Sequence, residues 1–97
     1  MEQAYILLNN VKNELKEKLP PAQYNTIFNE ITEIYKVQGG NIYLIVANSL
    51  EKFRLEKIYL SQMNEILNNY TNELMQFKFI TSSDATKEKE KKNSIGL

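Results

Sequence analysis

The side chains that most often carry chemistry in proteins are absent from this chain. Its 97 residues include no Cys and no His, which removes thiolate nucleophiles, cysteine-ligated metals and the commonest general base near neutral pH. Catalysis would have to use carboxylates, lysines or tyrosines, and the carboxylates alternate with lysines as they do on solvated helix faces. We therefore expect no catalytic residue, metal site or cofactor, and we predict that the chain is not an enzyme.

The composition predicts one small domain. Hydrophobic residues make up 42%, charged residues 25%, and the formal net charge is zero, which is typical of a globular chain with one modest core. Without net charge there is no general attraction to nucleic acid or anionic lipid. The apolar run over residues 4–8 is too short for a signal peptide, and no apolar stretch is as long as a membrane span. We expect a cytoplasmic protein with no membrane partner.

The spacing of apolar and turn-forming residues predicts three helices and three strands. In chain order they are helices over 3–19 and 21–30, strands over 34–37 and 42–47, a helix over 49–70 and a strand over 73–81. Pro20 and Pro21 separate the first two helices, because the residue before a proline is disfavoured in a helix. Gly39 and Gly40 supply the turn of a hairpin. Asn48 is a favoured helix cap, with Glu51 three residues on.

This order, α-α-β-β-α-β, predicts an α+β fold in which a three-stranded sheet is packed with helices. On the second helix, Tyr24, Phe28 and Ile31 form the predicted core stripe. Residues 82–97 are polar and of mixed charge without a core-forming pattern, so we predict a flexible tail or the start of an interdomain linker there.

Three stretches of the sequence carry the pattern of a known family. They are LP followed by QYNTI within residues 19–27, LIVANSL over 44–50 and EKIYL over 56–60, and ELMQFKFI over 73–80 closes the pattern. In this order and spacing they resemble the N-terminal domain (domain I) of DnaA, the bacterial replication initiator. The resemblance covers residues 4–81, so we interpret residues 1–81 as a DnaA domain I-like interaction domain.

The resemblance implies a protein–protein interaction module of DNA replication. Domain I of DnaA contacts the replicative helicase or its loader and regulators of initiation, self-associates weakly, and in some members touches single-stranded DNA. We expect a weak homodimer and at most weak binding of single-stranded DNA. In the family, ATP binding and origin recognition belong to later domains, and this chain has no phosphate-binding GxxxxGK[ST] loop.

The resemblance also assigns roles to individual residues. Those that match the family's partner surface are Gln23, Thr26, Ile27, Asn48 and Leu50, and those that match its self-association region are Tyr5 and Leu8. The alternative for the partner surface is that Ile27 and Leu50 belong to the core and that Asn48 only caps a helix. The alternative for the self-association region is that Leu8, with Tyr5 nearby, is a core or plain surface residue.

The chain departs from the family at several of these positions. Many members carry Trp where this chain has Leu8, Ile27 and Arg54. They also carry Phe in place of Leu50 and Pro in place of Ala47. Without the Trp at Leu8, a homodimer contact would lose a large rigid anchor, so we expect weaker dimerisation than in Trp-bearing members.

Two other functions remain open from the sequence. The α-β-β-α-β part is similar to KH domains but lacks their GxxG loop, and the alternative function is a KH-like module that binds single-stranded nucleic acid. Aromatic residues that could stack on bases are Tyr35, Tyr43, Phe77 and Phe79, and a basic patch could come from Lys52, Arg54, Lys57 and Lys78. The weaker alternative is a stand-alone phage or plasmid regulator that uses the same fold.

Overall fold

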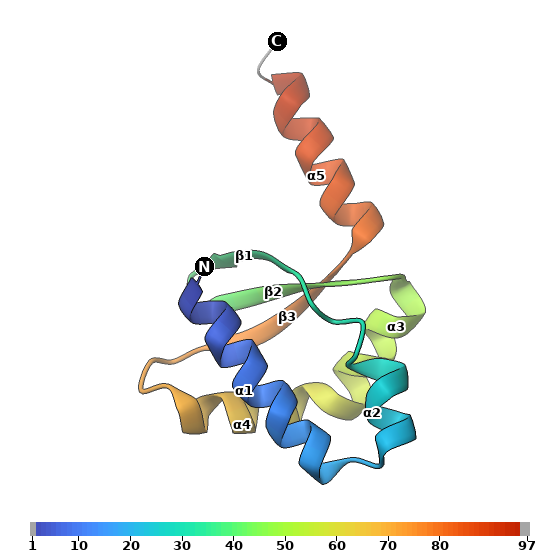
Figure 1. The fold of residues 1–97 in the computed structure, drawn as a ribbon. Coiled ribbons are helices and arrows are strands. Elements are labelled where there is room, and N and C mark those ends of the chain that lie inside the picture. Colours follow the sequence, from blue (N-terminus) through green and yellow to red (C-terminus); the bar gives the residue numbers. More distant parts are fainter. Residues whose placement is uncertain (1, 96–97) are drawn as a thin grey trace.

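The computed structural model describes residues 2–95, with side chains over 2–88, and arranges helices around one three-stranded sheet (Figure 1). In chain order the elements are α1 Glu2–Lys18, α2 Pro21–Ile27, β1 Ile34–Gln38, β2 Asn41–Val46, α3 Ser49–Arg54, the π-helical turn η1 Leu55–Tyr59, α4 Leu60–Tyr70, β3 Gln76–Thr81 and α5 Ser82–Ile95. The predicted α+β class with a three-stranded sheet is confirmed, and the element order is consistent with the prediction.

The sheet is mixed, with strand order β1-β2-β3. β1 and β2 form an antiparallel hairpin, and β2 runs parallel to β3. Gly39 (φ 59°) and Gly40 (φ 80°) make the hairpin turn with positive φ angles that favour glycine. The long helical connection from α3 to α4 returns the chain to the start of β3, as a parallel pairing requires.

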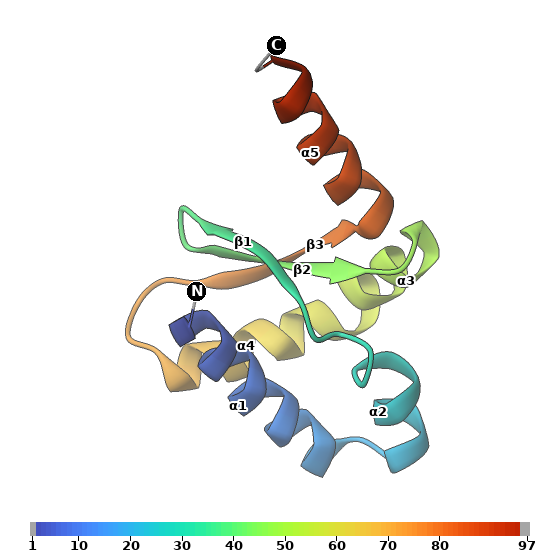
Figure 2. The same ribbon diagram turned by 45° about the horizontal axis from the view of Figure 1, so that its top comes forward.

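The core lies between the helices and one face of the sheet. Figure 2 shows α1 and α4 together on that side, where they pack against each other. Residues of β2 alternate, so that Ile42, Leu44 and Val46 are buried while Tyr43 and Ile45 on the opposite face are only half-buried. Paired with them on β3, Phe77 and Phe79 are also buried.

The predicted core stripe of the second helix is confirmed, because Tyr24, Phe28 and Ile31 are all buried. The Phe28 ring stacks on Tyr24 with centroids 5.8 Å apart and meets the edge of Tyr59 at 5.2 Å. These aromatic contacts fasten α2 to η1. The helix is shorter than predicted, ending at Ile27, and the chain then turns toward β1.

The predicted third helix is continuous but contains a π-helical turn. The Leu60 N–H bonds the Leu55 carbonyl, five residues back, so η1 holds one extra residue per turn. Leu55 and Tyr59 of this turn are buried, whereas no residue of α3 is. The result is that α3 projects from the body with most of its surface exposed.

The sequence predicted a flexible tail or the start of an interdomain linker over residues 82–97. Residues 82–95 form helix α5, and residues 96–97 lie outside the described residues. The Thr81 hydroxyl accepts a hydrogen bond from the Asp84 N–H and caps the helix, and Ala85 is buried against the body. The following Lys and Glu residues favour helices even without a core-forming pattern. In Figure 1, α5 extends away from the sheet. Its role as an interdomain linker stays a prediction.

The helices within residues 2–95 include none that is both long enough and apolar enough to cross a membrane.

Candidate partner-binding site

The predicted partner residues lie on α2 and around the start of α3, which sit at the same end of the molecule (Figure 2). On α2, Gln23 and Thr26 are exposed, whereas Ile27 is buried at 8% exposure. The Thr26 hydroxyl donates a 2.8 Å hydrogen bond to the Ala22 carbonyl within the helix. Thr26 can therefore contact a partner through its methyl group and accept a hydrogen bond at its hydroxyl oxygen.

Asn48 is the N-cap of α3. Its side-chain oxygen accepts a 2.9 Å hydrogen bond from the Glu51 N–H, so the predicted capping role is confirmed. The residue is exposed, and capping leaves its side-chain NH₂ free to donate outward.

Leu50 is 64% exposed on the outer surface of α3. The sequence did not decide whether Ile27 and Leu50 are core or surface residues. In the structure Ile27 belongs to the core and Leu50 to the surface. The difference follows from the projecting position of α3, because this helix buries none of its side chains.

A groove of about 430 Å³ lies between α2, the end of β2 and the start of α3. Thr26, Ile27 and Asn48 line it, so the structure brings these three predicted residues together. Gln23 and Leu50 are not among the lining residues. Leu50 is nevertheless adjacent in sequence to the lining segment at the start of α3, and Gln23 lies one turn from Ile27.

Two further exposed apolar residues follow Leu50 along the same helical segment. Phe53 is 58% exposed and Ile58 is 61% exposed. The Lys57 ammonium lies over the Phe53 ring, 5.7 Å from its centroid. The sequence prediction missed both residues, although Phe53 follows Leu50 at a spacing of three and so lies on the same helix face.

The predicted basic residues of this segment are partly neutralised. Arg54 Nη1 lies 3.8 Å from Glu51 Oε1, one helical turn apart, and both side chains are partly exposed. The Lys57 ammonium makes a cation–π contact with the Phe53 ring. This arrangement resembles a self-paired helix face more than a basic patch.

Lys12 on α1 supports one wall of the groove. Its ammonium donates a 2.8 Å hydrogen bond to the carbonyl of Ile31, which lines the groove. Burial of the Lys12 side chain lowers its pKa from the ordinary value. The bond joins α1 to the segment between α2 and β1, so the groove wall is held in place by the core of the domain.

The predicted self-association residues lie mainly inside the molecule. Leu8 is buried at 2% exposure, and the half-buried Tyr5 accepts a 3.1 Å hydrogen bond at its hydroxyl from the Ile34 N–H. Ile6, between them, is 55% exposed. The role of Tyr5 and Leu8 in self-association stays a prediction, and Ile6 is the apolar side chain that α1 offers there.

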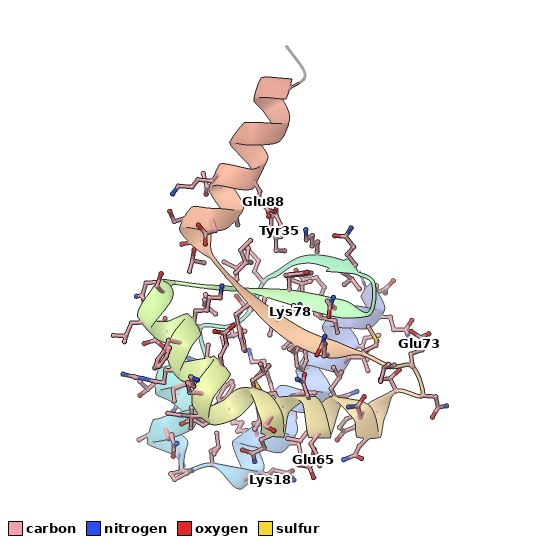
Figure 3. All side chains as sticks on the ribbon, turned by 180° about the vertical axis from the view of Figure 1, so that it is seen from behind. Lys18, Tyr35, Glu65, Glu73, Lys78 and Glu88 are labelled. Atoms are coloured by element: carbon pink, nitrogen blue, oxygen red, sulfur yellow. The ribbon has the colours of Figure 1, made fainter. Side chains whose placement is uncertain are left out.

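The sheet face opposite the core carries two tyrosines. The Lys36 ammonium lies over Tyr43, 4.9 Å from the ring centroid, and within 5.8 Å of Tyr35. Figure 3 shows Tyr35 beside Glu88 of α5, with Lys78 farther along the sheet. A hydrogen bond to Glu88, with desolvation and charge repulsion as smaller causes, raises the pKa of Tyr35. Phe77 and Phe79, the other strand aromatics, are in the core.

Comparison with known proteins gives one family and two curated relatives. The family described as DnaA N-terminal domain matches residues 7–69. Two sequences named chromosomal replication initiator protein DnaA, from Acholeplasma laidlawii and from its strain PG-8A, are each 27% identical over 82 residues. The alignments cover 84% of this chain and 18% of each relative, so the chain spans less than a fifth of the length of the curated relatives it matches.

Proposed function

This chain belongs to the DnaA N-terminal domain family, and from that premise we propose that it is the protein-docking domain of a replication initiator. The proposed partners are the replicative helicase or its loader and regulators of initiation. Self-association is proposed as a weak accompanying activity.

The observation that carries this proposal is the exposed apolar surface at the start of the third helix. Leu50 and Phe53 are both more than half exposed on a helix that buries none of its side chains. A few exposed apolar anchors beside groups that form hydrogen bonds are typical of protein interfaces. Thr26 and Asn48 supply such polar groups at the neighbouring groove.

The mechanism of the proposed activity is docking without chemistry. A partner would cover Leu50 and Phe53 and hydrogen-bond to Asn48. Because Lys12 joins the groove wall at Ile31 to α1, this wall is held in place before a partner binds. Binding to a preformed surface costs less ordering entropy than binding to a mobile segment.

The test is a pull-down of purified helicase, helicase loader and initiation regulators from the source organism on the immobilised domain. Leu50→Ala is expected to weaken capture of the true partner by roughly tenfold or more, as expected for an interface anchor. Leu74→Ala is the matched control, since Leu74 is 94% exposed in the segment before β3, away from α3. Equal loss with both variants, or no loss with Leu50→Ala, would overturn the assignment.

Thr26→Ala gives a second comparison on α2. Its matched control is Thr86→Ala on α5, because Thr86 makes the same hydrogen bond to the carbonyl four residues back, at 2.9 Å. Both variants should stay folded by circular dichroism. Only Thr26→Ala is expected to reduce partner capture.

The open sheet face supports a second candidate function, a KH-like module for single-stranded nucleic acid. Tyr35 and Tyr43 with Lys36 combine rings and a cation on one face. In a titration with single-stranded DNA followed by NMR, this function predicts shifts at Tyr43 and an affinity that falls steeply with salt. If such binding were micromolar, the docking proposal would give way to it.

A further inference from the structure

The groove between α2 and α3 combines an apolar floor with an acidic rim. Its floor includes Ile27, Ile31, Val46 and Leu55, all of which are buried core residues. The rim carries three carboxylates, and they come from three different segments of the chain. They are Glu30 after α2, Glu33 before β1 and Glu51 in the first turn of α3.

The rim is negative although the whole chain has no net charge. Within residues 2–95, the side chains that line the groove include no Lys and no Arg. Arg54 Nη1 lies 3.8 Å from Glu51 Oε1 and neutralises part of the Glu51 charge, so the negative charge of the rim comes mainly from Glu30 and Glu33. The C-terminal end of α2 at Ile27 and the N-terminal end of α3 at Asn48 both border the groove, and their partial charges have opposite signs, so the helix ends add little net charge.

We infer that this groove receives a partner segment that presents an arginine or lysine between apolar residues. The inference rests on the proposed docking function and names the chemistry of the partner at that same site. A long basic side chain suits both parts of the groove, because its alkyl stem can lie on the apolar floor while its charged head reaches the carboxylates.

Charge complementarity selects this occupant over others. An acidic peptide or the phosphate backbone of a nucleic acid would meet the carboxylates of Glu30 and Glu33 and find no Lys or Arg among the lining residues. The carboxylates are also dispersed: no group of three or more Asp or Glu within residues 2–95 is arranged to hold a metal ion. The apolar residues that flank the basic side chain would meet Leu50 and Phe53 beside the groove.

The test uses three synthetic peptides that differ at one position, acetyl-LARLA-amide, acetyl-LAQLA-amide and acetyl-LAELA-amide. Each is titrated into the isotope-labelled chain, and amide shifts are followed by NMR. The arginine peptide is expected to shift Glu30, Glu33 and Glu51 and to bind roughly threefold to fivefold more tightly than the glutamine peptide, with the glutamate peptide weakest. Its affinity should fall when NaCl is raised from about 0.05 to about 0.5 M.

Two triple variants provide the matched comparison. Glu30→Gln/Glu33→Gln/Glu51→Gln should abolish the preference for the arginine peptide. Glu17→Gln/Glu65→Gln/Glu73→Gln, which changes three exposed glutamates outside the groove, should leave it intact. Equal binding of the arginine and glutamate peptides, an absence of shifts at the groove with millimolar arginine peptide, or shifts confined to Tyr35 and Tyr43 would each overturn the inference.

The partner pull-down separates this inference from the proposed function. If Leu50→Ala lowers partner capture and the groove triple variant does not, docking stands and the basic occupant is rejected. If neither variant lowers capture, the docking proposal itself fails. If Leu50→Ala and the groove triple variant each lower capture, the docking proposal and the basic occupant are both supported.

Discussion

The Gln23 side-chain amide donates a hydrogen bond to the hydroxyl of Tyr59, whose ring is buried in the core. Gln23 lies on α2, and Tyr59 is the last residue of the π-helical turn η1. The exposed edge of α2 is therefore linked through one bond to the segment that turns α3 away from the body. Gln23, proposed as a partner residue, has a structural role as well.

Gln23→Ala should lower the free energy of unfolding by about 1 kcal/mol, because it leaves the Tyr59 hydroxyl without this partner. Urea denaturation followed by circular dichroism measures the change. In a Tyr59→Phe background the same substitution should cost close to nothing, since the hydroxyl is gone. Full additivity of the two substitutions would show that the bond contributes nothing to stability.

Asn48 has a capping role and a proposed docking role that one pair of variants can separate. Asn48→Ala should lower the free energy of unfolding by about 1 kcal/mol through loss of the bond to the Glu51 N–H. Asn48→Ser keeps a cap but removes the side-chain NH₂, so its stability should stay near that of the parent. If partner capture falls with Asn48→Ser as well, docking uses the amide. If capture falls only with the destabilised Asn48→Ala variant, Asn48 acts only as a helix cap.

Gly40 is the residue of the hairpin turn that tolerates no side chain. A Cβ built there would lie 2.7 Å from the Leu74 carbonyl oxygen, a backbone atom, and φ is +80°. Gly40→Ala should therefore cost at least about 2 kcal/mol of stability. Gly39→Ala is the control, because its φ is +59° but no atom lies within 4 Å, and it should cost about 1 kcal/mol. Thermal denaturation of both variants measures the difference, and equal losses would contradict the steric argument.

The elements were predictable because their signals are local. Apolar spacing identified the helix faces, Gly39 and Gly40 marked the hairpin, and Asn48 marked a helix start. The π-helical turn was not predictable, because its extra residue at Leu55–Tyr59 reflects packing against the core and not a residue pattern. Helix α5 was missed because its sequence lacks an apolar stripe, the signal from which helices were predicted.

The candidate site was predictable only in part. The resemblance supplied Thr26, Ile27 and Asn48, which do share one groove. The exposure of Leu50 depends on how far α3 projects and the burial of Ile27 on how α2 packs, and no spacing in the sequence encodes either. Glu30 and Glu33 line the groove because the chain after α2 folds back alongside β2, a tertiary contact invisible to a linear pattern.

The raised pKa of Tyr35 predicts how the stability of the chain changes at alkaline pH. The hydrogen bond to Glu88, then desolvation and repulsion by the same carboxylate, raise the pKa of Tyr35 above its ordinary value of about 10. The folded chain thus keeps this proton at pH values where the unfolded chain loses it. The contribution of Tyr35 to stability is fully present below about pH 10 and is lost as pH rises through the folded-state pKa.

Glu88→Gln should therefore bring the pKa of Tyr35 back toward its ordinary value and reduce the loss of stability above about pH 10. Tyrosinate absorbance gives the titration of Tyr35 as the difference between the chain and its Tyr35→Phe variant. Urea denaturation at several alkaline pH values gives the stability. Glu73→Gln, at an exposed position between α4 and β3, is the control and should change neither curve. An unchanged Tyr35 titration in Glu88→Gln would mean that α5 does not hold Glu88 against the sheet in solution.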